Sequence, residues 1–146
     1  LPRPTRFRWR PFGYRLIASV LGLGALSSVV GGLIRPAFTN PDFALLTPWP
    51  QQVFIGAGTL VAAVAAWAIW TQRRYAPEVY AGWAVLMLAF KVYGAVVLTP
   101  RVGLAWHFPA MAREPGWKDL SYLIGGNLAF YGLVYAYLAW RRPPAA

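Results

Sequence analysis

Four long apolar stretches alternate with shorter polar or proline-containing segments along the chain. They cover residues 16–34, 52–71, 78–98 and 120–140. A bilayer core of about 30 Å requires about 20 apolar helical residues, and each stretch meets that length. Helices suit such stretches because lipid offers no hydrogen-bond partner to an exposed backbone. The pattern therefore predicts an all-α integral membrane protein that crosses the bilayer four times.

The segments between the stretches predict a four-helix bundle with up-down-up-down order. Residues 72–77 form a short connection, which makes the second and third helices antiparallel neighbours. The other connections, 35–51 and 99–119, are longer and contain several prolines. We expect a basic arm at residues 1–14, a transmembrane domain at 15–140 and a short tail at 141–146.

Small residues recur at four-residue spacing in three of the stretches. Close backbone approach drives helix association in lipid, so we expect these residues to mark helix interfaces. They are Gly24, Ser28 and Gly32; Gly58, Ala62 and Ala66; and Ser121, Gly125 and Ala129.

Composition excludes several classes of soluble protein. Hydrophobic residues make up 58% of the chain and charged residues 12%, whereas a soluble domain carries about 25% charged residues. This excludes a soluble globular enzyme, a disordered tail and a basic nucleic-acid module. We expect membrane lipids and other membrane protein subunits as partners, and no nucleic acid.

Basic residues at the ends of the stretches predict the orientation. The net charge is +10, and nine arginines fall in the N-terminal segment, the 72–77 connection and the C-terminal tail, against four basic residues in the other connections. The positive-inside rule then places both termini in the cytoplasm, with the protein in the cell membrane, the inner membrane of a prokaryote. Aromatic residues predict a belt at the same interface: Trp67, Trp70, Tyr75, Tyr80, Trp83 and Trp140.

Lys91 is a charged residue well inside an apolar stretch. It lies seven residues before Leu98, about 10 Å below the edge of the span. A charge at this depth costs roughly 2.5–3.5 kcal/mol on insertion scales, which makes it a functional candidate. Asn127, Thr59 and Ser28 fall at similar depth and predict a polar layer that contacts a ligand. Alternatively, Lys91 snorkels to the headgroups and the other three hydrogen-bond within or between helices.

The chain carries little self-contained chemistry. It has no cysteine and one histidine, His107, so it cannot alone build a zinc site, an iron–sulfur cluster or a thiol nucleophile. Nucleotide-binding, hydrolase and metalloprotease motifs are also absent. Trp106 and His107 lie in the 99–119 connection and either meet solvent or face a ligand at the mouth of the bundle. We expect no catalytic residue and no self-contained cofactor, but contact with a quinone, lipid or pigment.

Two motifs resemble the DoxX-type membrane proteins. One is LTPW at residues 46–49, leading into a stretch that ends in TQRRYA at 71–76, and the other is WKDLSYLIGGNLA at 117–129. The resemblance covers residues 15–140 and implies a four-helix membrane subunit of quinone-linked redox complexes, including thiosulfate:quinone oxidoreductase in some members. It carries over no catalytic residue.

These observations predict a multi-pass accessory subunit of a larger respiratory or photosynthetic redox complex that borders a quinone or pigment site. Two alternatives stay open. One is a DoxX-type quinone-linked oxidoreductase subunit, in which the Lys91 layer contacts the quinone. The other is a small transporter or channel, which requires a water path through the bundle.

Overall fold

The computed structural model describes residues 10–34, 49–97, 111 and 113–142. These residues form four long helices: α1 (Arg10–Val29), continued by the π-helical turn η1 (Val30–Ile34), α4 (Trp49–Trp70), α5 (Ala76–Val96) and α7 (Trp117–Trp140). No strand occurs in this part of the chain. Each of the four helices has the length and the apolar composition that are needed to cross a membrane. The predicted all-α fold is confirmed, with the architecture of a multi-pass membrane protein.

Each helix begins before the apolar stretch from which it was predicted. The first turns of α4 and α5 contain Pro50 and Pro77, which we had assigned to the connections. Proline is tolerated there because the N–H groups of a first turn have no partner within the helix. Likewise, α1 begins at Arg10, so residues 10–14 extend the first helix.

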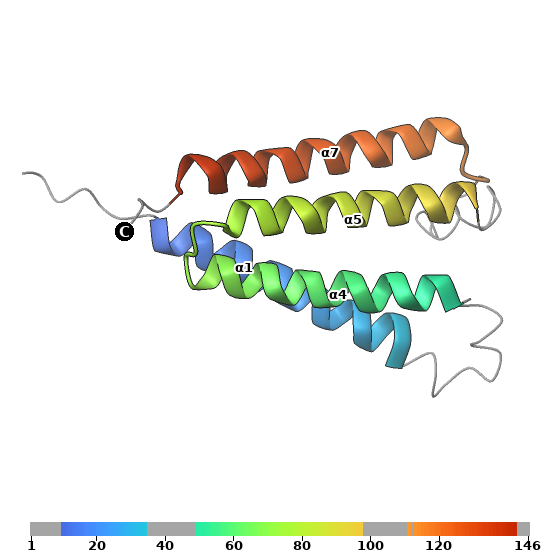
Figure 1. Ribbon diagram of the computed structural model, residues 1–146. Helices are drawn as coiled ribbons and strands as arrows, with labels where there is room; N and C mark the ends of the chain where they lie inside the picture. Colours follow the sequence, from blue (N-terminus) through green and yellow to red (C-terminus); the bar gives the residue numbers. More distant parts are fainter. Residues whose placement is uncertain (1–9, 35–48, 98–110, 112, 143–146) are drawn as a thin grey trace, which may run out of the picture.

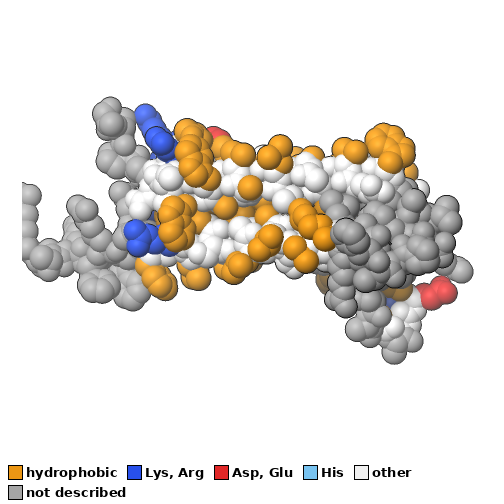
Figure 2. Space-filling view, turned by 90° about the horizontal axis from the view of Figure 1, so that it is seen from below, with side chains coloured by type: hydrophobic (Ala, Val, Ile, Leu, Met, Phe, Trp, Pro, Cys, Tyr) orange, Lys and Arg blue, Asp and Glu red, His pale blue; other side chains and the backbone are white. Residues whose placement is uncertain are grey.

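The helices lie in chain order, and successive helices run in opposite directions (Figure 1). Helix α1 packs on α4, α4 on α5, and α5 on α7. The start of α1, the α4–α5 connection and the end of α7 lie at one end of the bundle. We call this the basic end, defined by Arg15, Arg73, Arg74, Arg141 and Arg142. Figure 2 shows Lys and Arg side chains gathered at this end and apolar side chains along the flank.

The best-packed part of the core lies near the basic end. Tyr14 of α1, Ile69 of α4 and Leu138 of α7 are among its fully buried side chains. The Tyr14 hydroxyl donates a 2.8 Å hydrogen bond to the backbone carbonyl of Leu138, and its ring lies 6.3 Å from that of Tyr137. These contacts join the first helix to the last.

The α4–α5 connection closes with a helix-terminating motif. The Arg73 N–H donates to the Ala68 carbonyl at 2.8 Å, and the Gln72 N–H donates to the Ile69 carbonyl at 3.0 Å. These two bonds define a Schellman motif, whose left-handed position usually carries glycine. Here Gln72 occupies it, with a φ of 54°.

Part of the predicted aromatic belt is present at the basic end. Guanidinium groups lie over three exposed indole rings: Arg15 over Trp70 at 5.7 Å, Arg73 over Trp67 at 5.3 Å, and Arg141 over Trp140 at 4.4 Å. Such pairs suit a headgroup region, where one side of the ring is apolar and the other is wet.

Two members of the predicted belt face the interior of the bundle. Tyr80 is 2% exposed, and Trp83 packs against the core cluster. Both face the interior because they occupy the side of α5 that is turned toward the other helices, which apolar periodicity alone does not reveal in an all-apolar helix.

Candidate functional site

A partly open cavity of about 580 Å³ lies between the four helices. Its volume falls within the range of small-molecule sites. Lining residues along α1 run from Leu16 to Ser28, a rise of about 18 Å at 1.5 Å per residue. The cavity is therefore elongated parallel to the helix axes.

The cavity follows from the way α1 and α7 diverge. Tyr14 and Leu138 hold the two helices together at the basic end, and Figure 1 shows them moving apart toward the opposite end. Helices α4 and α5 lie between them and complete the lining. An apolar space is thus left between the first and last helices.

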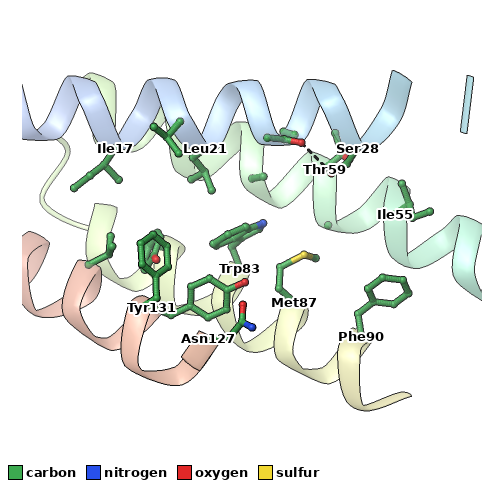
Figure 3. A pocket seen from close by; sticks show the side chains of 18 of the residues that line it. Ile17, Leu21, Ser28, Ile55, Thr59, Trp83, Met87, Phe90, Asn127 and Tyr131 are labelled. Carbon is green, nitrogen blue, oxygen red and sulfur yellow. Dashed lines mark hydrogen bonds between the residues drawn. The ribbon is translucent and has the colours of Figure 1, made fainter. Parts of the chain in front are cut away.

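An aromatic face of α5 forms one wall. Tyr80, Trp83, Met87 and Phe90 line the cavity, and their spacing of three, four and three residues places them on one side of the helix. Figure 3 shows Trp83 and Met87 pointing from α5 into the space below α1, and Phe90 pointing toward Ile55 of α4. The rings of Tyr80 and Trp83 lie 5.6 Å apart, and Trp83 meets Tyr131 of α7 edge to face at 5.3 Å.

Three residues of the predicted polar layer line this cavity. Ser28, Thr59 and Asn127 reach it from α1, α4 and α7, respectively. The Ser28 hydroxyl donates to its own helix at the Gly24 carbonyl, and the Asn127 amide donates to the Leu123 carbonyl. The Thr59 hydroxyl is buried without a hydrogen-bond partner in the described part of the chain.

The other predicted site residues lie elsewhere. Lys91 is half-buried on α5 but is not part of the cavity wall. It directly follows Phe90, and successive side chains of an α-helix are rotated by about 100° around its axis, so Lys91 points away from the cavity-lining face of α5. It makes no ion pair with another residue of the described ranges. Trp106 and His107 lie outside the described residues.

Sequence reasoning missed the aromatic face. Tyr80 and Trp83 were assigned to the interfacial belt, and Met87 and Phe90 were not singled out. The available signal was the spacing of these four large side chains, which places them on one side of α5. The hydroxyl of Tyr80, like that of Thr59, is buried without a partner among the described residues.

The arrangement suits binding of an apolar molecule with few polar groups. Nearly all lining side chains are apolar or aromatic, and no group of three His, Cys, Asp or Glu residues in the described ranges is placed to hold a metal ion. Comparison of the chain with protein-family models, curated proteins and solved structures gives no match. The resemblance to DoxX-type proteins therefore stays a prediction.

Proposed function

We propose that this chain is a multi-pass membrane subunit of a larger redox assembly and that its interhelical cavity binds a quinone or pigment. The observation that carries the proposal is the elongated apolar cavity lined by all four helices. Such sites bind ligands through apolar contact and fix orientation with a few polar groups. A quinone with an isoprenoid tail and a polyene pigment both have this shape and polarity.

The position of the cavity favours a ligand that enters from lipid. The cavity is partly open and is bordered by both α1 and α7, which diverge away from the basic end (Figure 1). A molecule dissolved in the bilayer reaches this space without crossing the headgroup layer. The apolar lining disfavours the water path that a transporter or channel requires.

Helix α7 supports a role within an assembly. Only 6% of its span is buried, compared with 22–28% for the other three spans. The small residues predicted to mark an interface on this helix, Ser121, Gly125 and Ala129, are all exposed. Because small residues let helices approach closely in lipid, this face suits a helix of another subunit. The small residues of α4 differ, since Gly58 lies against Met87 and Ala62 is in the core.

The proposal places the basic end in the cytoplasm and the protein in the inner membrane of a prokaryote. The three arginine–tryptophan pairs support the cytoplasmic placement of the basic end, because basic residues are enriched on the cytoplasmic side and tryptophan at the interface.

Assembly is tested by native electrophoresis after mild detergent extraction from the native membrane. We expect co-migration with a larger redox complex, and loss of that co-migration for Gly125→Leu. Gly56→Leu on α4 is the matched control, because a Cβ at either glycine meets nothing within 4 Å. A wild-type protein that migrates alone contradicts the subunit role.

Ligand binding is tested on the same purified material. We expect organic extraction and mass spectrometry to recover a quinone or a pigment in stoichiometric amount. Recovery of phospholipid alone contradicts this part of the proposal. Quinone reduction by the isolated chain would instead support the DoxX-type oxidoreductase alternative.

A further inference from the structure

Two side chains of the cavity wall, Tyr80 and Trp83, carry hydrogen-bond donors. Tyr80 is 2% exposed, and its hydroxyl makes no hydrogen bond within the described part of the chain. Trp83 lines the same cavity one turn further along α5. Figure 3 shows its indole nitrogen directed into the cavity.

The chemistry of these two donors limits which kinds of atom are suitable as their hydrogen-bond partners. A buried tyrosine hydroxyl usually has a hydrogen-bond partner, because an unpaired polar group in an apolar site carries its full desolvation cost. The N–H of the partly buried Trp83 faces the cavity, so a ligand that fills the cavity without accepting from it would impose the same cost. An indole N–H donates and cannot accept. A partner for Trp83 must therefore be an acceptor, and the Tyr80 hydroxyl is able to donate to the same kind of atom.

The two donors belong to one aromatic surface. The Tyr80 ring contacts the Trp83 ring, which in turn contacts Tyr131 across the α5–α7 interface. Three residues along a helix correspond to a rise of about 4.5 Å, so Tyr80 and Trp83 border the same region of the cavity. That region lies toward the basic end, since the wall continues along α5 to Phe90.

The rest of the cavity suits a hydrocarbon. Beyond Trp83 the wall of α5 continues with Met87 and Phe90, and Phe54 of α4 lies 5.5 Å from Phe90, ring to ring. These side chains offer neither strong donors nor strong acceptors. A chain placed along them lies parallel to the helices.

We infer that the cavity selects an apolar molecule with a carbonyl oxygen at one end, which accepts hydrogen bonds from Trp83 and Tyr80 while its hydrocarbon part extends toward Phe54 and Phe90. The inference rests on the proposed function and adds the chemistry and direction of the head. Trp83 and Tyr80 are the residues that confer this selectivity.

The test compares two probes with the same hydrocarbon skeleton. One is 2-decyl-1,4-benzoquinone, which has two carbonyl groups, and the other is decylbenzene, which has none. Binding of tritiated 2-decyl-1,4-benzoquinone to the full chain in detergent is measured by scintillation proximity, and decylbenzene is measured as a competitor. We expect the wild type to bind the quinone at least tenfold more tightly.

Four variants assign the selectivity to its residues. We expect Trp83→Phe and Tyr80→Phe each to weaken quinone binding about three- to tenfold, the loss of one hydrogen bond, and to leave decylbenzene binding unchanged. Trp67→Phe and Tyr135→Phe are matched controls, because both side chains are exposed and neither lines the cavity. Unchanged decylbenzene binding also shows that a variant keeps its cavity.

The outcomes separate the inference from the proposed function. If neither probe binds the wild type, the ligand cavity of the proposed function fails. If both probes bind equally, or if Trp83→Phe and Tyr80→Phe keep the wild-type preference for the quinone, the cavity stands and the carbonyl head is overturned.

Discussion

The hydroxyl of Tyr14 in α1 donates a 2.8 Å hydrogen bond to the backbone carbonyl of Leu138 in α7. The two residues are 124 positions apart, and both are fully buried. This bond closes the bundle at the basic end, whereas the helices diverge beyond it (Figure 1).

Removing this bond is expected to weaken the closed end. Tyr14→Phe keeps the ring and deletes the hydroxyl, so the free energy of unfolding in detergent should fall by about 0.5–1.5 kcal/mol, the net worth of a buried hydrogen bond. Tyr135→Phe, on an exposed tyrosine of α7, should leave it within about 0.5 kcal/mol. An equal effect of the two variants would contradict this role for Tyr14.

Gly13 is expected to tolerate no larger residue while Tyr137 keeps its position. A Cβ at Gly13 would lie 2.0 Å from the Tyr137 hydroxyl oxygen. Gly13→Ala should therefore cost about 1–3 kcal/mol of unfolding free energy, as overpacking does. Gly24→Ala is the control, because a Cβ there meets nothing within 4 Å.

A double variant distinguishes this clash from a general effect of alanine. Tyr137→Leu removes the obstructing hydroxyl, so Gly13→Ala combined with Tyr137→Leu should cost less than the sum of the two single variants. Strict additivity in the unfolding measurements would show that the two positions do not interact.

The effect of a substitution at Gln72 on stability is expected to depend on how well the new residue adopts a left-handed backbone conformation. Its φ of 54° lies in the left-handed region, which glycine adopts without steric cost and β-branched residues resist. Gln72→Gly should raise the thermal unfolding midpoint or leave it unchanged, because glycine avoids the cost of about 1–2 kcal/mol that any residue with a Cβ carries in this conformation. Gln72→Ile should lower the midpoint, because a β-branched side chain adds to that cost. The opposite order of the two midpoints would contradict this assignment.

Asp119 is expected to contribute more to the free energy of unfolding than Arg113, its ion-pair partner. It accepts from both terminal nitrogens of Arg113, at 2.7 and 3.0 Å, and from the Gly116 backbone N–H at 2.8 Å. Asp119→Ala removes the cap of α7 as well as the ion pair, so it should cost about 1–2 kcal/mol. Arg113→Ala removes the ion pair between a largely exposed arginine and a buried carboxylate but keeps the bond to Gly116, so it should cost less than Asp119→Ala.

Exposed Lys118 provides the control for this terminus. Lys118→Ala should change the unfolding free energy by no more than about 0.5 kcal/mol. Equal losses for Asp119→Ala and Arg113→Ala would show that the ion pair, and not the bond to Gly116, stabilises the start of α7.

The existence and number of the long helices were predictable from the sequence, because a lipid environment demands long apolar helices. Their starting points were not, since a proline such as Pro50 or Pro77 is as compatible with the first turn of a helix as with a connection. The apolar count also missed residues 10–14, which carry polar groups within the first helix.

The cavity was predictable only in part. Ser28, Thr59 and Asn127 were predicted to lie at equal depth, and all three line the same cavity. The depth of a residue was predictable because it follows from the position of that residue along its helix. Which side chains face inward depends on how each helix is rotated against its neighbours, and all four helices are apolar on every side. That is why sequence depth alone grouped Lys91 with the polar layer and placed Trp83 in the interfacial belt.

The side-by-side order of the helices has a consequence for biogenesis. Each helix packs on the one made just before it, so every hairpin is able to form as soon as its second member leaves the translocation machinery. The contact between Tyr14 and Leu138 needs the whole chain and forms last. Until then, helix α1 is held by α4 and not yet by α7, so the basic end stays unclosed while the last helix is being made.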